Sequence, residues 1–221
     1  AAGKPLSIVD GMPLGIKDLI ETVDMPTEYN CELFIGNRPI RDAASVYFLR
    51  KGGAIILGKT VTVTLGGGDP SKSRNPFDTR RTPGGSSSGS CAAIGAAMIP
   101  GALGTHARGS TIRPASFCGA YGLKATFGAL NRQGGFSAAA SMDHLGVIAG
   151  SIEDMWIVAR YISEHAGGDP GYPGMYGSAT PPPARKPERL IFLEGAGWEA
   201  TDEASQEAFR GAIRELEAGG V

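Results

Sequence analysis

Three observations predict an α/β fold for this chain. The segment "RDAASVYFLRKGGAIILGKT" shows a helix pattern, then two glycines, then an apolar strand pattern, an order typical of folds that combine helices and strands. Two later segments, 151–165 and 201–220, have polar caps followed by apolar residues at helical spacing. Hydrophobic residues make up 42% of the 221 residues, enough for the core of one domain or a large part of one.

The first elements are a strand, a helix and a second strand. Residues 13–20, "PLGIKDLI", predict a buried strand with its two charges near the end. In the helix that follows, Asp42 is the expected N-cap, and Gly52 and Gly53 are the expected stop. The run "AIILGKT" predicts the second strand.

A serine-rich segment, "TPGGSSSGS" at residues 82–90, raises the first functional question. It could be a flexible Gly/Ser linker, but the elements on both sides look buried. It could be a phosphate loop, but such a loop closes with GK[ST], whereas this one closes with "SGSC". The residues that follow, "CAAIGAAM", are so small that a helix there must pack closely on its neighbours.

The remaining elements continue the α/β pattern, with no internal repeat. We expect a strand and a turn in "IPGALGTHARGS", a helix capped by Ser151, a Pro-rich connector at about 180–187, a strand in "RLIFLEG" and an amphipathic helix at 201–220. The apolar stripe of the helix at 151–165 comprises Ile152, Met155, Trp156, Ala159 and Ile162.

The composition argues against several classes of partner. The net charge of −1, with no block of Lys or Arg, predicts no binding to nucleic acid or to an anionic membrane surface. No apolar run approaches the roughly 20 residues that cross a bilayer, and the N-terminal residues show no signal peptide. Three cysteines without a CxxC spacing predict reduced, mostly buried thiols and a cytoplasmic location.

A serine nucleophile needs a base, and the chain offers two kinds. The histidines are His106, His144 and His165, but no GxSxG elbow surrounds any serine. The second kind is a buried lysine, which loses its proton near neutral pH because burial disfavours the ammonium. Lys17 lies in an apolar run, although it could also be a strand-end lysine whose amine reaches water.

The run "TPGGSSSGSCAAIGAAMIPGALGTHARGSTIRPASFCGAYGLKAT" resembles the amidase signature family, in its "GGSSSGS" branch. The upstream segments "PLGIKDLIETVDMPT" and "RKGGAIILGKT" resemble two further parts of the family, in the same order. The resemblance implies a mixed β-sheet core surrounded by helices. It also implies that residues 1–221 are an amidase signature domain truncated at both ends. The implied chemistry is amide hydrolysis by a Ser-cisSer-Lys triad, without metal or organic cofactor.

By position, the resemblance places the lysine base at Lys17, the bridging serine at Ser86 and the nucleophile at Ser110. Ser86 would follow a cis peptide bond and pass a proton from Ser110 to neutral Lys17. The resemblance further implies an oxyanion hole and two supporting residues. The hole consists of the backbone N–H groups of Ala107, Arg108, Gly109 and Ser110, and the supporting residues are Ser87 and Thr105.

Two departures from the family pattern concern the turn around Ser110. Many members have "GTDTGGS" or "GTQTGGS" where this chain has "GTHARGS". If the position of Arg108 needs a positive φ, the side chain costs about 1 kcal/mol there. Arg113 lies three residues after Ser110, a spacing similar to the branch with malonamide-type hydrolases, in which this arginine is associated with a substrate carboxylate. Arg113 could instead tie the turn to backbone carbonyls or to an acid.

Three functions remain open at this point. The first is an amidase acting on a small-molecule amide, with a carboxylate on that amide if Arg113 binds it. The second is the glutaminase subunit of a tRNA-dependent amidotransferase, which would pass ammonia to a partner subunit. The third is a non-catalytic scaffold, suggested by Arg108 and by the short chain. The sequence leaves the oligomeric state open, with a homodimer among the options.

Overall fold

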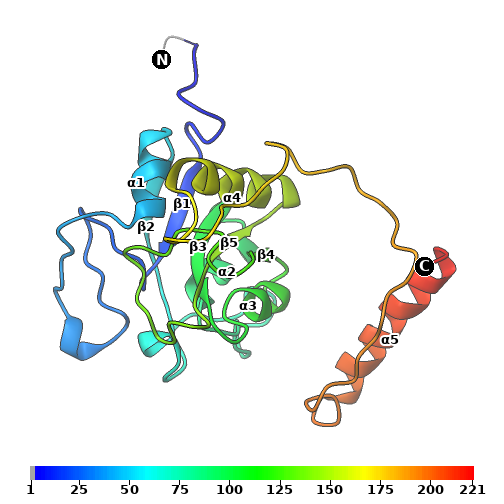
Figure 1. Ribbon diagram of the computed structural model, residues 1–221. Helices are drawn as coiled ribbons and strands as arrows, with labels where there is room; N and C mark the ends of the chain where they lie inside the picture. Colours follow the sequence, from blue (N-terminus) through cyan, green and yellow to red (C-terminus); the bar gives the residue numbers. More distant parts are fainter. Residues whose placement is uncertain (1–2) are drawn as a thin grey trace. The chain divides into compact units, whose positions relative to one another are not determined.

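A computed structural model describes residues 3–221 of the chain, which divides into two units (Figure 1). The first unit comprises Ala1–Pro181 and the second Pro182–Val221, and each is described by itself. The division falls within the Pro-rich connector expected at about 180–187.

The first unit is built on one mixed sheet of five strands. In chain order the strands are β1 (Pro13–Lys17), β2 (Ile55–Thr60), β3 (Gly101–His106), β4 (Tyr121–Lys124) and β5 (His144–Ala149). Their spatial order is β2-β1-β3-β5-β4. Strand β1 runs parallel to both β2 and β3, whereas β5 is antiparallel to β3 and β4. The mixed sheet implied by the resemblance is therefore confirmed.

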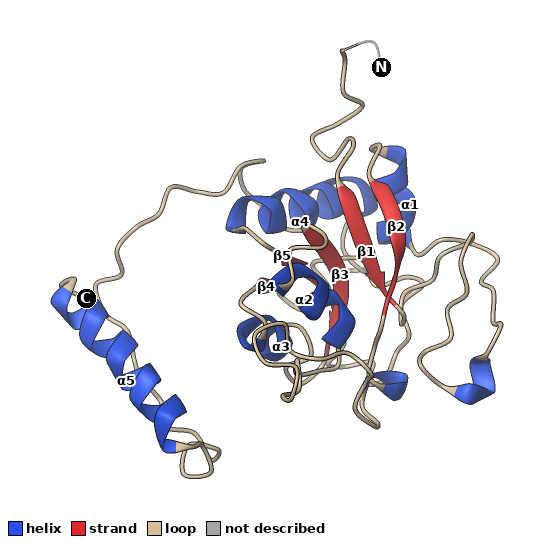
Figure 2. Cartoon of the chain, turned by 180° about the vertical axis from the view of Figure 1, so that it is seen from behind, coloured by secondary structure: helices blue, strands red, loops and turns tan. Residues whose placement is uncertain are grey.

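Helices cover both faces of this sheet. One face packs against α1 (Ala44–Lys51) and α4 (Ile152–Ala166), and the other against α2 (Ser88–Gly95) and α3 (Ile112–Phe117), as Figure 2 shows for α2. Strand β3 serves both cores, because Leu103 lies in the first and Ala102 in the second. Two short 3₁₀ helices, η1 (Glu32–Phe34) and η2 (Thr64–Gly66), lie in the loops after β1 and β2.

Helix α2 packs as closely as its small residues predict. A Cβ added at Gly89 would lie 2.4 Å from the backbone nitrogen of Val61. The N–H of Gly89 donates to the carbonyl of Val61 at 2.9 Å, so the helix is fastened to the chain just after β2. This contact places the start of α2, and with it the serine-rich segment, at the end of the parallel strands.

Several predicted boundaries are confirmed and others are wrong. Ser151 caps α4 by accepting from the N–H of Asp154 at 3.0 Å, as expected. Asp42 does not cap α1, because its carboxylate accepts from the N–H of Val23 and lies 3.2 Å from Arg50 Nε instead. The predicted strand at 13–20 ends at Lys17, after which the chain turns.

The stripe predicted for α4 is only partly the buried face. Ala159 and Ile162 are buried, but Ile152 is 47% exposed, and Val158 and Tyr161 take part in the core instead. Strands β4 and β5, which complete the antiparallel side of the sheet, were not expected from the sequence pattern.

The second unit contains one helix, α5 (Glu203–Ala218), whose N-cap Asp202 accepts from the N–H of Ser205 at 2.9 Å. The strand predicted in "RLIFLEG" does not form. A strand needs a neighbour to pair with, and residues 182–221 provide no second strand. Phe192 packs its ring against Trp198 and Phe209, with ring centroids 5.1 Å away in both cases.

We predict that Gly89→Ala destabilises the protein by about 1–3 kcal/mol, because the new methyl group meets the backbone of Val61. Gly58→Ala is the matched control, since a Cβ at Gly58 in β2 meets nothing within 4 Å. Urea unfolding measures both. Equal midpoints for the two variants would contradict the close packing of α2.

Candidate active site

Lys17 is the centre of the candidate site. It lies at the carboxyl end of β1 and is 0% exposed, so the alternative that its amine reaches water is wrong. Nζ donates to Ser86 Oγ at 2.7 Å and to Thr105 Oγ1 at 2.6 Å. Thr105 is within reach because parallel strands β1 and β3 end at the same edge of the sheet. Burial lowers the pKa of Lys17 to about 7, so a large share of this amine is neutral at neutral pH.

Ser86 lies in the loop before α2 and is 4% exposed. The peptide bond between Gly85 and Ser86 is cis, as the resemblance implies. The carbonyl of Ser86 accepts from the N–H of Val63 at 3.1 Å and from Thr62 Oγ1 at 3.2 Å. These bonds fix the backbone, so that the hydroxyl stays beside Lys17.

Ser110 lies in the turn between β3 and α3, and Ser87 fastens this turn to α2. The N–H of Ser87 donates to the carbonyl of Ser110 at 3.1 Å, and Ser87 Oγ donates to the carbonyl of Thr105 at 3.3 Å. Ser86 and Ser110 line one cleft of about 850 Å³. Hydrogen bonds thus join Lys17, Ser86 and Thr105. Ser110 lines the same cleft as Ser86, but the described part of the chain shows no hydrogen bond between these two serines.

His106 shapes the same turn through its ring. The backbone N–H groups of Gly109 and Thr111 point at Nε2 and Nδ1, at 3.1 and 3.2 Å. Burial lowers the pKa of His106 to about 4, so the imidazole is neutral at neutral pH. A neutral imidazole accepts at one nitrogen only. Thr111 is 0% exposed, and its N–H would be costly to leave unpaired, so we assign the acceptor to Nδ1 and the proton to Nε2.

None of the three histidines hydrogen-bonds to a serine hydroxyl in residues 3–221. His144 Nδ1 contacts the carbonyls of Met142 and His106, and His165 Nδ1 contacts the carbonyl of Tyr161. The geometry therefore favours the lysine over a histidine as the partner of a serine.

The two arginines near Ser110, Arg108 in the turn and Arg113 in α3, differ in their contacts. Positive φ falls on Gly109, at 122°, and Arg108 is not among the described residues with positive φ, so the strain considered for Arg108 does not arise. Arg113 Nη2 donates to the carbonyl of Gly85 at 2.8 Å. This bond corresponds to the alternative in which Arg113 ties the turn to a backbone carbonyl.

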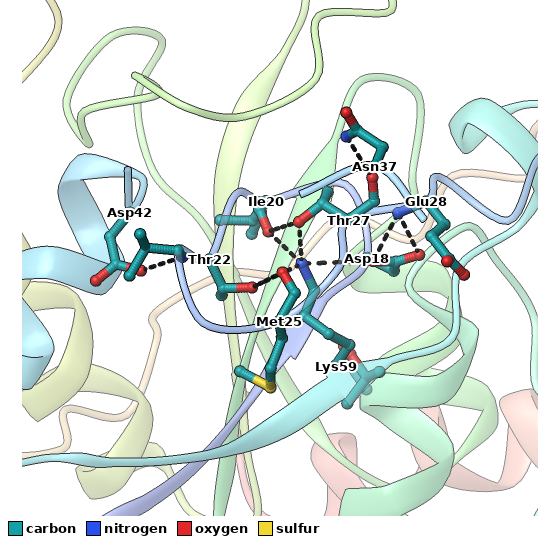
Figure 3. A network of polar contacts seen from close by, with 12 residues as sticks. Asp18, Ile20, Thr22, Met25, Thr27, Glu28, Asn37, Asp42 and Lys59 are labelled. Atoms are coloured by element: carbon teal, nitrogen blue, oxygen red, sulfur yellow. Dashed lines mark hydrogen bonds and ion pairs between the residues drawn. The ribbon is translucent and has the colours of Figure 1, made fainter. Parts of the chain in front are cut away.

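A second lysine, the half-buried Lys59 on β2, fastens the chain that follows Lys17, a role that no sequence pattern indicates. Lys59 Nζ donates to Thr27 Oγ1 at 2.7 Å and lies 3.4 Å from Asp18 Oδ1 (Figure 3). The Asp18 carboxylate also accepts from the N–H of Glu28 at 3.2 Å. Burial is the main cause that lowers the pKa of Lys59 and raises that of Asp18. This network holds the first turn after β1 against β2.

Residues 3–221 contain neither a metal cluster nor a helix suited to a membrane. No group of three or more His, Cys, Asp or Glu side chains there could hold a metal ion. Within the same residues, no helix combines the length and apolar character needed to cross a membrane. The three cysteines are free thiols; Cys91 and Cys118 are buried and Cys31 is half-buried.

Comparison with known sequences gives one family. Residues 1–221 match the Amidase family. Among curated relatives, a glutamyl-tRNA(Gln) amidotransferase subunit of Chloroflexus aggregans is 37% identical over 169 residues, 74% of this chain and 35% of the relative. The protein of the same name from Rhodopirellula baltica is 41% identical over 175 residues, 76% of this chain and 34% of the relative. The chain thus spans about a third of the length of these relatives.

Solved structures give the same result. The native peptide amidase from Stenotrophomonas maltophilia superimposes with a TM-score of 0.70 at 32% identity, over 79% of this chain and 38% of that one. The corresponding glutamyl-tRNA(Gln) amidotransferase subunit of Thermotoga maritima gives a TM-score of 0.65 at 34% identity, over 69% of this chain and 36% of that one.

We predict that the free energy of unfolding includes a contribution from Lys17 that rises between pH 7 and pH 10. The folded pKa is about 7 and that of an exposed lysine about 10.4, so the unfolded state binds more protons in this window. Urea unfolding of the protein and of Lys17→Met across this range measures the contribution, since other titrating groups cancel in the difference. Parallel stability curves would mean that Lys17 keeps an ordinary pKa.

Proposed function

The chain belongs to the amidase signature family. On this premise, we propose that the protein hydrolyses a carboxylic amide through an acyl-enzyme formed on Ser110. The observation that carries the proposal is the 2.7 Å hydrogen bond between buried Lys17 Nζ and Ser86 Oγ, beside the cleft that Ser110 lines. A buried amine with a pKa near 7 suits a general base, because it is neutral in part at the pH where it must accept a proton.

In the proposed reaction, Ser110 Oγ attacks the amide carbonyl while its proton passes to Ser86 and the proton of Ser86 passes to Lys17. The C–N bond then breaks, and the leaving nitrogen takes a proton back along the same path. Water attacks the acyl group in the second half, and Ser110 is restored. Thr105 holds the amine of Lys17 toward Ser86 throughout.

The developing oxyanion needs donors near Ser110. We propose the N–H groups of Ala107, Arg108, Gly109 and Ser110 for this role, with the positive φ of Gly109 setting the direction of the turn. Each step uses side chains and backbone groups of this chain, without a metal or an organic cofactor.

A second function is favoured by the curated relatives, which are named as subunits of glutamyl-tRNA(Gln) amidotransferase. In that case the same serine would release ammonia from glutamine for a partner subunit. Hydrolysis of free amides by the purified protein alone would favour the first function, and hydrolysis that requires another protein the second. The free thiols agree with the cytoplasmic location that we propose for either function.

We predict that a fluorophosphonate or phenylmethylsulfonyl reagent labels Ser110, because the relay makes this hydroxyl nucleophilic. Mass spectrometry of the digested protein locates the label, and Ser110→Ala is the control. Folded protein that takes up no label at Ser110 would support a non-catalytic scaffold and refute the proposed hydrolase.

We predict that Lys17→Ala abolishes turnover, and that kcat/KM of the unaltered protein rises with pH to a plateau above about pH 7. The sign follows from the lowered pKa, because only the neutral amine accepts a proton and its share grows as pH passes that value. Circular dichroism checks that the variant is folded. Near-normal turnover in Lys17→Ala would remove the lysine from the mechanism.

A further inference from the structure

Within residues 3–221, the charged side chains that line the cleft of Ser86 and Ser110 are all positive. Among its lining residues the charged side chains are Arg108 and Arg113, and the described lining includes no aspartate or glutamate. The remaining lining residues are glycines, alanines, small hydroxyl residues and apolar side chains. The charges of this lining therefore favour the binding of an amide that carries a negative charge, because two positive side chains attract it and no described negative side chain repels it.

The two arginines are not equally available to such a charge. Arg113 already donates to the carbonyl of Gly85, in the loop that carries Ser86. Arg108 is exposed and makes no side-chain hydrogen bond or ion pair within residues 3–221. A guanidinium has five N–H donors in a planar fork, which match the two oxygens of a carboxylate.

The backbone of Arg108 is held at a defined place relative to the reacting serine. Arg108 lies two residues before Ser110, in the turn after β3. The turn is fastened at both sides, by the N–H of Thr111 to His106 Nδ1 and by the N–H of Ser87 to the carbonyl of Ser110. A carboxylate bound by Arg108 would thus orient the rest of the substrate with respect to Ser110.

We propose that the substrates are small amides that carry a carboxylate near the scissile bond, and that the side chain of Arg108 reads this carboxylate. The inference rests on the proposed hydrolysis at Ser110. It assigns recognition of the substrate carboxylate to position 108, where many members of the family have glycine. Arg113, in contrast, holds the loop of Ser86.

The experiment compares two amides of equal size, succinamate with a carboxylate and succinamide without one. We expect the protein to prefer succinamate in kcat/KM, and Arg108→Gln to lower the succinamate-to-succinamide ratio about ten- to a hundredfold. Arg108→Gln keeps the backbone N–H, so the change reports on the guanidinium. Arg108→Lys should recover only part of the ratio, because an ammonium lacks the planar fork.

Arg113→Lys is the matched control and should leave the ratio unchanged, whatever it does to the overall rate. Equal losses on both amides in Arg108→Gln, or a ratio that falls in Arg113→Lys alone, would overturn the proposal. Wild-type protein that shows no preference for succinamate would overturn it as well.

A binding measurement separates this inference from the proposed reaction. Calorimetric titration of succinamate into Ser110→Ala needs no turnover, and adding Arg108→Gln should weaken binding about tenfold or more. If Ser110 of the wild-type protein takes up no label but this binding difference is present, the proposed hydrolysis is refuted and the proposed carboxylate site at Arg108 is supported. If Ser110 is labelled and the binding is unchanged, the anion site alone fails.

Discussion

The structure depends on one constraint, the removal of the Lys17 amine from water. An ammonium group in a protein interior is costly unless it is paired with a negative charge, and the two hydrogen-bond partners of Lys17 are neutral hydroxyls. The amine therefore tends to give up its proton, and as a neutral group it is satisfied by Ser86 and Thr105. The parallel pairing of β1 with β3 and the close approach of α2 both contribute to bringing these two hydroxyls to one buried nitrogen.

The parts of the site that the sequence predicts are those set by local pattern and by resemblance. The glycines and serines at 84–90 indicate a tight, buried turn, and Lys17 and Thr105 lie at the ends of apolar runs that form strands. Their mutual contact needs the parallel pairing of β1 with β3, which no local pattern contains. The resemblance supplies the expectation that these residues meet, since it implies a site of Lys17, Ser86 and Ser110 with Thr105 as a supporting residue.

What the sequence does not predict depends on contacts between distant residues. The run at 189–195 has the composition of a strand, but a strand also requires a partner, which residues 182–221 lack. Asp42 has the character of a cap, but its carboxylate is taken by the N–H of Val23 and by Arg50. The ring of His106 accepts from the N–H of Thr111, and the guanidinium of Arg113 donates to the carbonyl of Gly85; these partners likewise come together only in the folded chain.

The separation of the site residues along the chain has a consequence for how the protein folds. Lys17 lies 69 residues from Ser86 and 88 from Thr105, so the buried contacts of the amine close two long loops. Closing long loops costs chain entropy before the contacts form, and folds rich in such contacts fold slowly. During most of folding, the amine is therefore hydrated and charged. The pocket around it closes only when β1, β3 and α2 come together, and that closure lowers the pKa of the amine. The proton equilibrium of Lys17 is therefore linked to the pairing of β1 with β3 and to the docking of α2.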